Sequence, residues 1–138
     1  MVSALPTLVI VGRVESALRD AAVAPRQPDE GAPEARVRIE AGYRAALAGL
    51  HAGDRVTLVT WLDRADRSRL VTRPRGDDAR TETGVFATRS PDRPNPLGHH
   101  DVTITAVEPD GFRVDALEAF DGTPVVDVKP VLGPIDER

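Results

Sequence analysis

The most unusual segment of this sequence is the stiff, proline-rich run GVFATRSPDRPNPLG at Gly84–Gly98, whose polar groups could hold a ligand. Its prolines Pro91, Pro94 and Pro96 fix the backbone φ angle, and each pushes the residue before it toward an extended conformation. Such a segment cannot form a regular hydrogen-bonded ladder, so its amides and carbonyls need other partners, which a ligand could supply. Arg89 and Arg93 would add charged donors to this frame. The alternative is a rigid surface turn without a ligand.

A second segment, DGTPVVDVKP, combines a turn with side chains that can bind a ligand or carry a proton. Asp121 begins the turn, since Asp, Gly and Pro together are typical of turns. Asp127 and Lys129 are two residues apart, so both side chains would leave the same face of a strand. Lys129 is the sole lysine among 18 basic residues, which favours a buried or ligand-facing ammonium. The alternative is an exposed ion pair that contributes well under ~1 kcal/mol.

The histidines His51, His99 and His100 do not form a metal-binding motif. His99 and His100 are adjacent, so on a strand their side chains would point to opposite faces. The chain has no cysteine, which excludes cysteine-rich zinc sites, disulfides and thiol nucleophiles. The glycine-rich fingerprints of dinucleotide- and ATP-binding folds are absent, as is the nucleophile elbow of hydrolases. We therefore expect no metal site and keep His100 as a candidate proton acceptor.

Short segments with a period of two residues predict that β-strands position both motifs. Tyr43, Ala46, Leu47 and Leu50 fall on one face of a short helix. The sequence thus predicts an all-β dominated fold, a single-sheet β-barrel-like domain of about seven strands with one short helix. The expected strands are Thr7–Val14, the residues around Val37 and Ile39, Arg55–Leu62, Val85–Thr88, Asp101–Val107, Phe112–Leu117 and Val125–Val128, with Arg69–Arg73 as an additional short edge strand.

The bulk properties are those of one globular domain, which we expect to span residues 1–138. The net charge is −4, so a nucleic-acid partner would have to meet a local basic patch. Residues 64–93 carry eight arginines against five acidic residues, a composition that a solvated surface loop would share. No apolar run approaches the ~20 residues of a membrane span, and no basic region precedes the first apolar run. We expect a cytoplasmic protein without membrane contact.

Four strings, in this order, resemble the TrmO family, the TsaA-like methyltransferases that modify N6 of threonylcarbamoyladenosine in tRNA. They are VGRVES near the start, PRQP at Pro25–Pro28, the proline segment Gly84–Gly98, and Asp121–Pro130. The two longer strings are very specific, and the resemblance extends along nearly the whole chain. The chain is similar to a short, single-domain form of the family.

The resemblance implies a β-barrel-like fold, S-adenosylmethionine as methyl donor, and a homodimer with the cofactor near the subunit interface. For catalysis, the candidates are Asp121, Asp127, Lys129 and His100, with the carboxylates accepting hydrogen bonds or a proton. The cofactor-binding residues that we expect are Gln27, Phe86, Arg89, Ser90, Arg93, Asn95, Pro96, Leu97, Gly98, Asp121, Gly122, Thr123 and Pro124.

Three functions follow as expectations from this resemblance. The first is N6-methylation of threonylcarbamoyladenosine in the anticodon loop of tRNA, the second is methylation of a small molecule, and the third is S-adenosylmethionine binding without catalysis. Three departures from the longer bacterial members bear on this choice. The chain ends soon after the expected barrel, His99 and His100 stand where those members have an apolar and a small hydroxyl residue, and Val131 replaces an aromatic residue.

Overall fold

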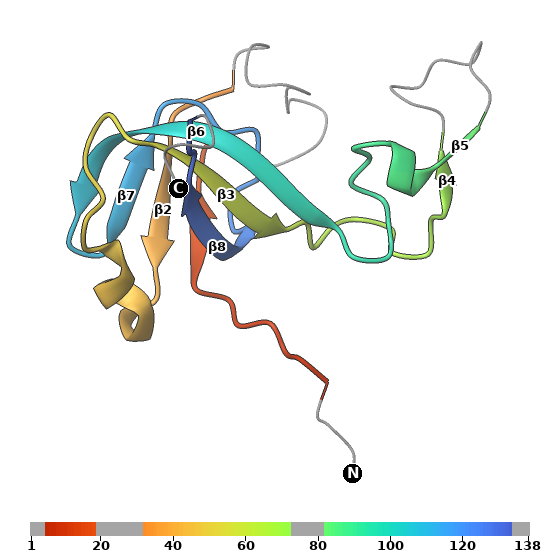
Figure 1. Cartoon of the computed structure of the whole chain (residues 1–138), viewed down its shortest axis with the longest axis horizontal. Coiled ribbons are helices and arrows are strands. Elements are labelled where there is room, and N and C mark those ends of the chain that lie inside the picture. The colour runs from red at the N-terminus through yellow and green to blue at the C-terminus, as the bar shows by residue number, and fades with distance from the viewer. Residues whose placement is uncertain (1–4, 19–31, 73–81, 134–138) are drawn as a thin grey trace.

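The structure, a computed structural model, describes residues 5–18, 32–72 and 82–133 and shows a closed β-barrel with a small arm (Figure 1). The six barrel strands follow the order β1-β2-β7-β6-β3-β8, and neighbouring strands are antiparallel. The prediction of an all-β, single-sheet barrel with one short helix is thereby confirmed. The elements are β1 (Gly12–Glu15), β2 (Ala35–Ile39), the 3-10 helix η2 (Ala41–Leu47), β3 (Arg55–Trp61), β4 (Val71–Thr72), β5 (Thr83–Gly84), the 3-10 helix η4 (Val85–Ala87), β6 (Leu97–Glu108), β7 (Gly111–Val114) and β8 (Pro124–Pro130).

Alternating side chains fill the interior of the barrel, as the period of two residues requires. Val37 in β2, Val56 and Leu58 in β3 and Phe112 in β7 are all fully buried, and residues between them face outward. Phe112 is the largest side chain in this core. Closure of the sheet leaves no unpaired barrel edge, which is how such a small all-β domain avoids edge-to-edge association.

One expected strand is wrong in type, and several differ in extent. Of the expected Phe112–Leu117, the strand β7 ends at Val114, and of the expected Arg69–Arg73, β4 covers Val71–Thr72 within the described residues. Val85–Thr88 is not a strand, because the chain turns there into η4, and the Thr88 amide and hydroxyl both donate to the carbonyl of Val85. The expected strand Thr7–Val14 is a strand only from Gly12 onward. Leu8 and Val9 are about half exposed, and this part of the chain leads away from the barrel (Figure 1).

The strand β6 is longer than the expected Asp101–Val107 and begins directly after Pro96. Its residue Gly98 pairs with Thr60 near the end of β3, and Thr60 pairs on its other side with Val125 of β8. The residues that leave the proline segment and those that enter β8 therefore flank the same end of β3. This register brings the two sequence motifs to one end of the barrel.

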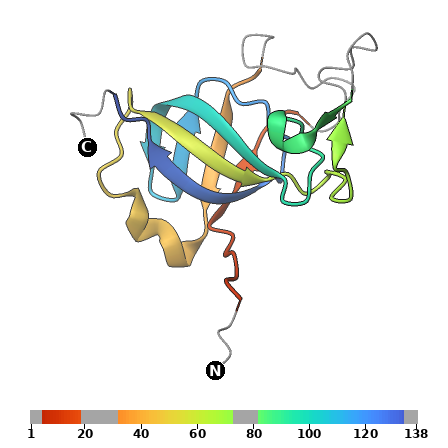
Figure 2. The ribbon, with the colours of Figure 1, turned by 45° about the vertical axis from the view of Figure 1, so that its right-hand side comes forward.

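The arm consists of β4, β5 and η4 and projects beyond the barrel in both views (Figures 1 and 2). It exposes apolar side chains, with Leu70 at 65% and Phe86 at 89% of their full accessibility. Among the described residues, no helix combines the length and apolar character needed to cross a bilayer.

Candidate functional site

The proline segment Gly84–Gly98 is held in shape by one of its own arginines. The Arg93 guanidinium donates hydrogen bonds to the carbonyls of Ser90 (2.7 Å), Val85 (2.7 Å) and Thr88. A planar guanidinium can satisfy several acceptors at once because its donors have a fixed fork geometry. Arg93 thus serves as an internal brace that connects the start of the segment with its middle.

The other predicted residues of this segment divide into exposed and buried groups. Phe86, Arg89, Asn95 and Leu97 are exposed, so their side chains are accessible to a ligand or a partner. Ser90 is half-buried. Pro96 and Gly98 are buried and form part of the barrel end itself, since β6 begins between them. Gln27 lies outside the described residues.

The turn at Asp121 is anchored to the chain that follows β1. The Asp121 carboxylate accepts a hydrogen bond from the Ser16 amide (3.0 Å), and its own amide donates to the carbonyl of Leu18 (2.7 Å). Gly122 has a φ of 84°, in the left-handed region that favours glycine. Thr123 and Pro124 are buried as the chain enters β8. At least part of the hydrogen-bonding capacity of Asp121 is therefore used to position the turn.

A short stretch after β3 connects the two motifs through arginines that the sequence indicates only as part of a basic region. The Arg67 guanidinium donates to the carbonyl of Pro94 (2.8 Å) and lies 5.0 Å from the Trp61 ring. On the other side, the Arg64 guanidinium lies 4.3 Å from the ring of Phe120, the residue before the Asp121 turn. Cation–π contacts of this kind contribute about 0.5–1 kcal/mol at exposed sites.

His100 and His99 point to opposite faces of β6, as predicted. His99 is exposed, whereas His100 is 7% exposed and hydrogen-bonds Thr60 and Glu118 inside the barrel end. Sequence reasoning missed Glu118. The sequence does contain a signal, since the Glu118 carboxylate stands between the apolar residues Leu117 and Ala119. The structure shows that both of these neighbours are buried.

The structure does not place Asp127 and Lys129 with the Asp121 turn. They extend from the outer face of β8, opposite Val59 and Thr57 of β3. Their side chains are 53% and 69% exposed, and the Lys129 ammonium nitrogen is 4.0 Å from the Asp127 carboxylate. In the single chain this is the geometry of an exposed ion pair.

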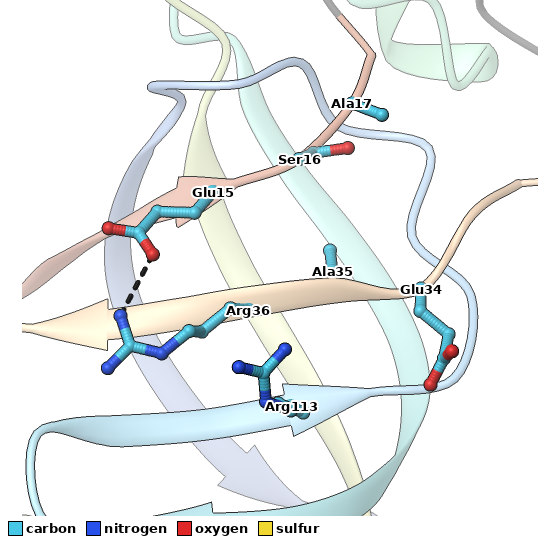
Figure 3. Close-up of a pocket in the computed structure, with 7 residues that line it drawn as sticks. All are labelled: Glu15, Ser16, Ala17, Glu34, Ala35, Arg36 and Arg113. Carbon is cyan, nitrogen blue, oxygen red and sulfur yellow. Dashed lines mark hydrogen bonds and ion pairs between the residues drawn. The ribbon is translucent and has the colours of Figure 1, made fainter.

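Two cavities lie on other parts of the barrel. One, of about 310 Å³, opens between the ends of β1, β2 and β7 (Figure 3). Arg36 crosses its wall and pairs with Glu15 (2.8 Å), Glu108 (2.8 Å) and Asp110, and its guanidinium holds the pKa of the Glu108 and Asp110 carboxyls below their usual range. The second, of about 130 Å³, is mainly apolar and lies against η2 and Asp127. No residue of the proline segment or of the Asp121 turn lines either cavity.

The chain is similar in sequence to proteins that are named as S-adenosylmethionine-binding proteins or as a tRNA methyltransferase. A family model described as the tRNA-methyltransferase O N-terminal domain matches residues 13–137. A protein of Halobacterium salinarum, named as a probable S-adenosyl-L-methionine-binding protein, is 40% identical over 124 residues, or 88% of this chain and 95% of that protein. A protein of Archaeoglobus fulgidus with the same description is 38% identical over 128 residues, or 91% of this chain.

The solved structures agree with the sequence relatives. The crystal structure of TrmO from Pseudomonas aeruginosa superposes with a TM-score of 0.75 and 27% identity, over 94% of this chain and 57% of that one. The chain also spans only 34% of the length of the Archaeoglobus relative. On the family match over residues 13–137, and on identities near 40% along about nine-tenths of its length, the chain belongs to the tRNA-methyltransferase O (TrmO) family.

Proposed function

We propose that this protein is an S-adenosylmethionine-dependent methyltransferase that acts on N6 of threonylcarbamoyladenosine in the anticodon loop of tRNA. The observation that carries the proposal is the meeting of Gly84–Gly98 and Asp121–Pro124 on either side of the end of β3, in a chain of this family. Family membership and the names of the relatives support S-adenosylmethionine as the cofactor.

The side chains at this end of the barrel fit the chemistry of the cofactor. Arg89 is exposed and would pair with a carboxylate, and Asn95 and Ser90 offer the donors and acceptors that a nucleoside needs. S-adenosylmethionine supplies a methyl group on a sulfonium, which is the difficult part of the chemistry. The protein then has to hold the acceptor nitrogen in line with that methyl group, and positioning of this kind can lower a barrier by roughly 7–11 kcal/mol.

Each motif has a part in this positioning. Arg93 keeps the proline segment rigid, so that little ordering is needed on binding. Asp121 fixes the turn against Ser16. Asp127, whose side chain is 53% exposed, is the carboxylate that would take the proton from the acceptor nitrogen, and Lys129 beside it would orient a carboxylate or carbonyl of the acceptor.

We propose further that the enzyme is a homodimer and that the second copy completes the site. Asp127 and Lys129 face outward, so in one chain nothing among the described residues encloses them together with the proline segment. Phe86, which is part of that segment, is exposed, and so is Leu70, whose carbonyl accepts a hydrogen bond from the amide of Val85 (2.9 Å). Exposed apolar surface of this kind marks an interaction site.

Removal of Phe86 tests the dimer. We expect Phe86→Ser to raise the dissociation constant of the dimer at least tenfold, because burying a phenylalanine contributes about 1.5–3 kcal/mol. Light scattering with size-exclusion chromatography over a concentration series measures the change. His51→Ser, an exposed substitution near η2 and remote from the arm, is the control. A monomeric wild-type protein at micromolar concentration would contradict the proposal.

Methyl transfer with a labelled cofactor tests the acceptor. We expect label in tRNA that carries threonylcarbamoyladenosine and none in the same tRNA without that modification. Because Arg64, Arg67, Arg69 and Arg89 are exposed at this end of the barrel, tRNA affinity should also fall steeply between 50 and 200 mM salt, roughly tenfold or more. Label in a small-molecule extract and none in tRNA would contradict tRNA as the acceptor and identify a small molecule in its place. Label in no fraction would contradict the methyltransferase assignment.

A further inference from the structure

A buried hydrogen-bonded network connects three elements at the end of the barrel. The His100 ring, on β6, is 7% exposed and lies between two partners. Its Nε2 atom is 2.8 Å from the hydroxyl of Thr60, which is fully buried at the end of β3. Its Nδ1 atom is 2.8 Å from one carboxylate oxygen of Glu118, in the connection between β7 and β8.

The chemistry of the partners determines which atom donates and which accepts in each of these hydrogen bonds. With Glu118 as a carboxylate, which only accepts hydrogen bonds, the Nδ1–H of His100 must be the donor. Nε2 of a neutral ring then accepts from the Thr60 hydroxyl, and in a charged ring it donates to that same hydroxyl. Both ring nitrogens are therefore satisfied in either state, which keeps the ring in one orientation.

Glu118 depends on this one contact. Its second oxygen, Oε2, is buried and makes no hydrogen bond with the part of the chain that the structure describes. The Glu118 side chain is 20% exposed, and a buried polar atom without a partner is costly, so the bond from His100 is a large part of what stabilises the carboxylate in this position. The position of Glu118 should accordingly follow the position of the His100 ring.

The network contacts the proline segment and lies close in sequence to the Asp121 turn. Gly98, the last residue of the proline segment, packs against it so closely that an added Cβ would be 2.5 Å from the Thr60 hydroxyl and 2.8 Å from Nε2 of His100. On the other side, Glu118 precedes the Asp121 turn by three residues. A movement of the ring would thus change the spacing between the proline segment and the turn.

We propose that His100 is a positioning residue for cofactor binding, which acts by holding Glu118 and thereby the Asp121 turn at a fixed distance from the proline segment. The inference rests on the proposed function, since it concerns the affinity of that same site for S-adenosylmethionine. It assigns His100 no contact with the cofactor and no proton transfer.

The test compares the two adjacent histidines by calorimetric titration with S-adenosylmethionine. We expect His100→Ala to raise the dissociation constant at least tenfold and His99→Ala, on the exposed face of the same strand, to leave it within twofold. His100→Asn should restore most of the affinity, because its amide nitrogen can donate to Glu118 from nearly the position of Nδ1. An affinity of His100→Ala within twofold of the wild type overturns the inference, and so does a failure of the asparagine variant to improve on alanine.

A second measurement uses the unaltered protein and does not depend on the variants folding. In protein labelled with ¹⁵N at histidine, we expect a His100 Nδ1–H signal that is protected from solvent exchange and shifts when S-adenosylmethionine saturates the protein. An unchanged signal at saturation overturns the inference and leaves the proposed function intact. Absence of any S-adenosylmethionine binding by the wild type overturns the proposed function, and this inference with it.

Discussion

Arg93→Ala is expected to raise the dissociation constant for S-adenosylmethionine about a hundredfold. The substitution removes the donors that brace the proline segment through the carbonyls of Ser90, Val85 and Thr88. Hydrogen bonds from charged groups contribute about 1.5–3 kcal/mol each, and partial exposure of this arginine reduces that figure. Without the brace, the segment would have to be ordered on binding. A net loss of about 2.7 kcal/mol of binding free energy corresponds to the hundredfold change.

Two matched variants give this prediction its control. Arg93→Lys keeps the charge but cannot reproduce the planar fork, so its affinity should lie between those of the wild type and the alanine variant. Arg38→Ala removes an exposed arginine on β2, away from the proline segment, and should change the affinity by less than twofold. Calorimetric titration of the three proteins measures the effect. An Arg93→Ala affinity within threefold of the wild type would show that the brace is dispensable for binding.

Gly111→Ala is expected to destabilise the barrel by about 3–5 kcal/mol, a large part of the 5–15 kcal/mol typical of a domain. A Cβ at Gly111 would lie 1.9 Å from the carbonyl oxygen of Val37 and 3.0 Å from its carbonyl carbon. Both atoms belong to the backbone of β2, which pairs with β7 at this point, so no side-chain movement can relieve the overlap. The two strands would have to separate beside the buried ring of Phe112.

Thermal and urea unfolding measure this effect. A loss of that size corresponds to a decrease of roughly 10–20 °C in the midpoint of thermal unfolding for a chain of this length. Gly42→Ala is the matched control, because an added Cβ there meets nothing within 4 Å, and its stability should equal or slightly exceed that of the wild type. A Gly111→Ala midpoint within 3 °C of the wild type would contradict the close packing of β2 and β7.

The barrel could be predicted from the sequence where alternation and local turn signals agreed. Alternation predicts β2 and β6, apolar runs predict β3 and β8, and the Pro-Asp-Gly turn predicts the hairpin of β6 and β7. The first strand was extended too far, because the apolar residues Leu8 and Val9 look like core residues in isolation. Only the structure, in which no strand among the described residues pairs with them, shows that Leu8 and Val9 are not core residues. The η4 helix was read as a strand for the same reason.

The sequence predicts the two motifs of the candidate site but not their relative positions in the fold. Strand register, which brings Gly98 and Val125 to either side of Thr60, depends on pairing between residues distant in the chain. The same is true of Arg64 against Phe120 and of His100 against Glu118. Spacing alone gave the common face of Asp127 and Lys129, but it could not reveal that this face is the outside of the barrel.

The binding of S-adenosylmethionine at the end of the barrel is the central claim, and an amide nuclear magnetic resonance titration with the cofactor tests it most directly. We predict saturable shifts of the non-proline amides in Gly84–Gly98 and Asp121–Pro124, with the amides of η2 unchanged. Shifts confined to the cavity beside η2, or to the cavity lined by Glu15, Arg36 and Arg113, would contradict the claim and place the cofactor elsewhere.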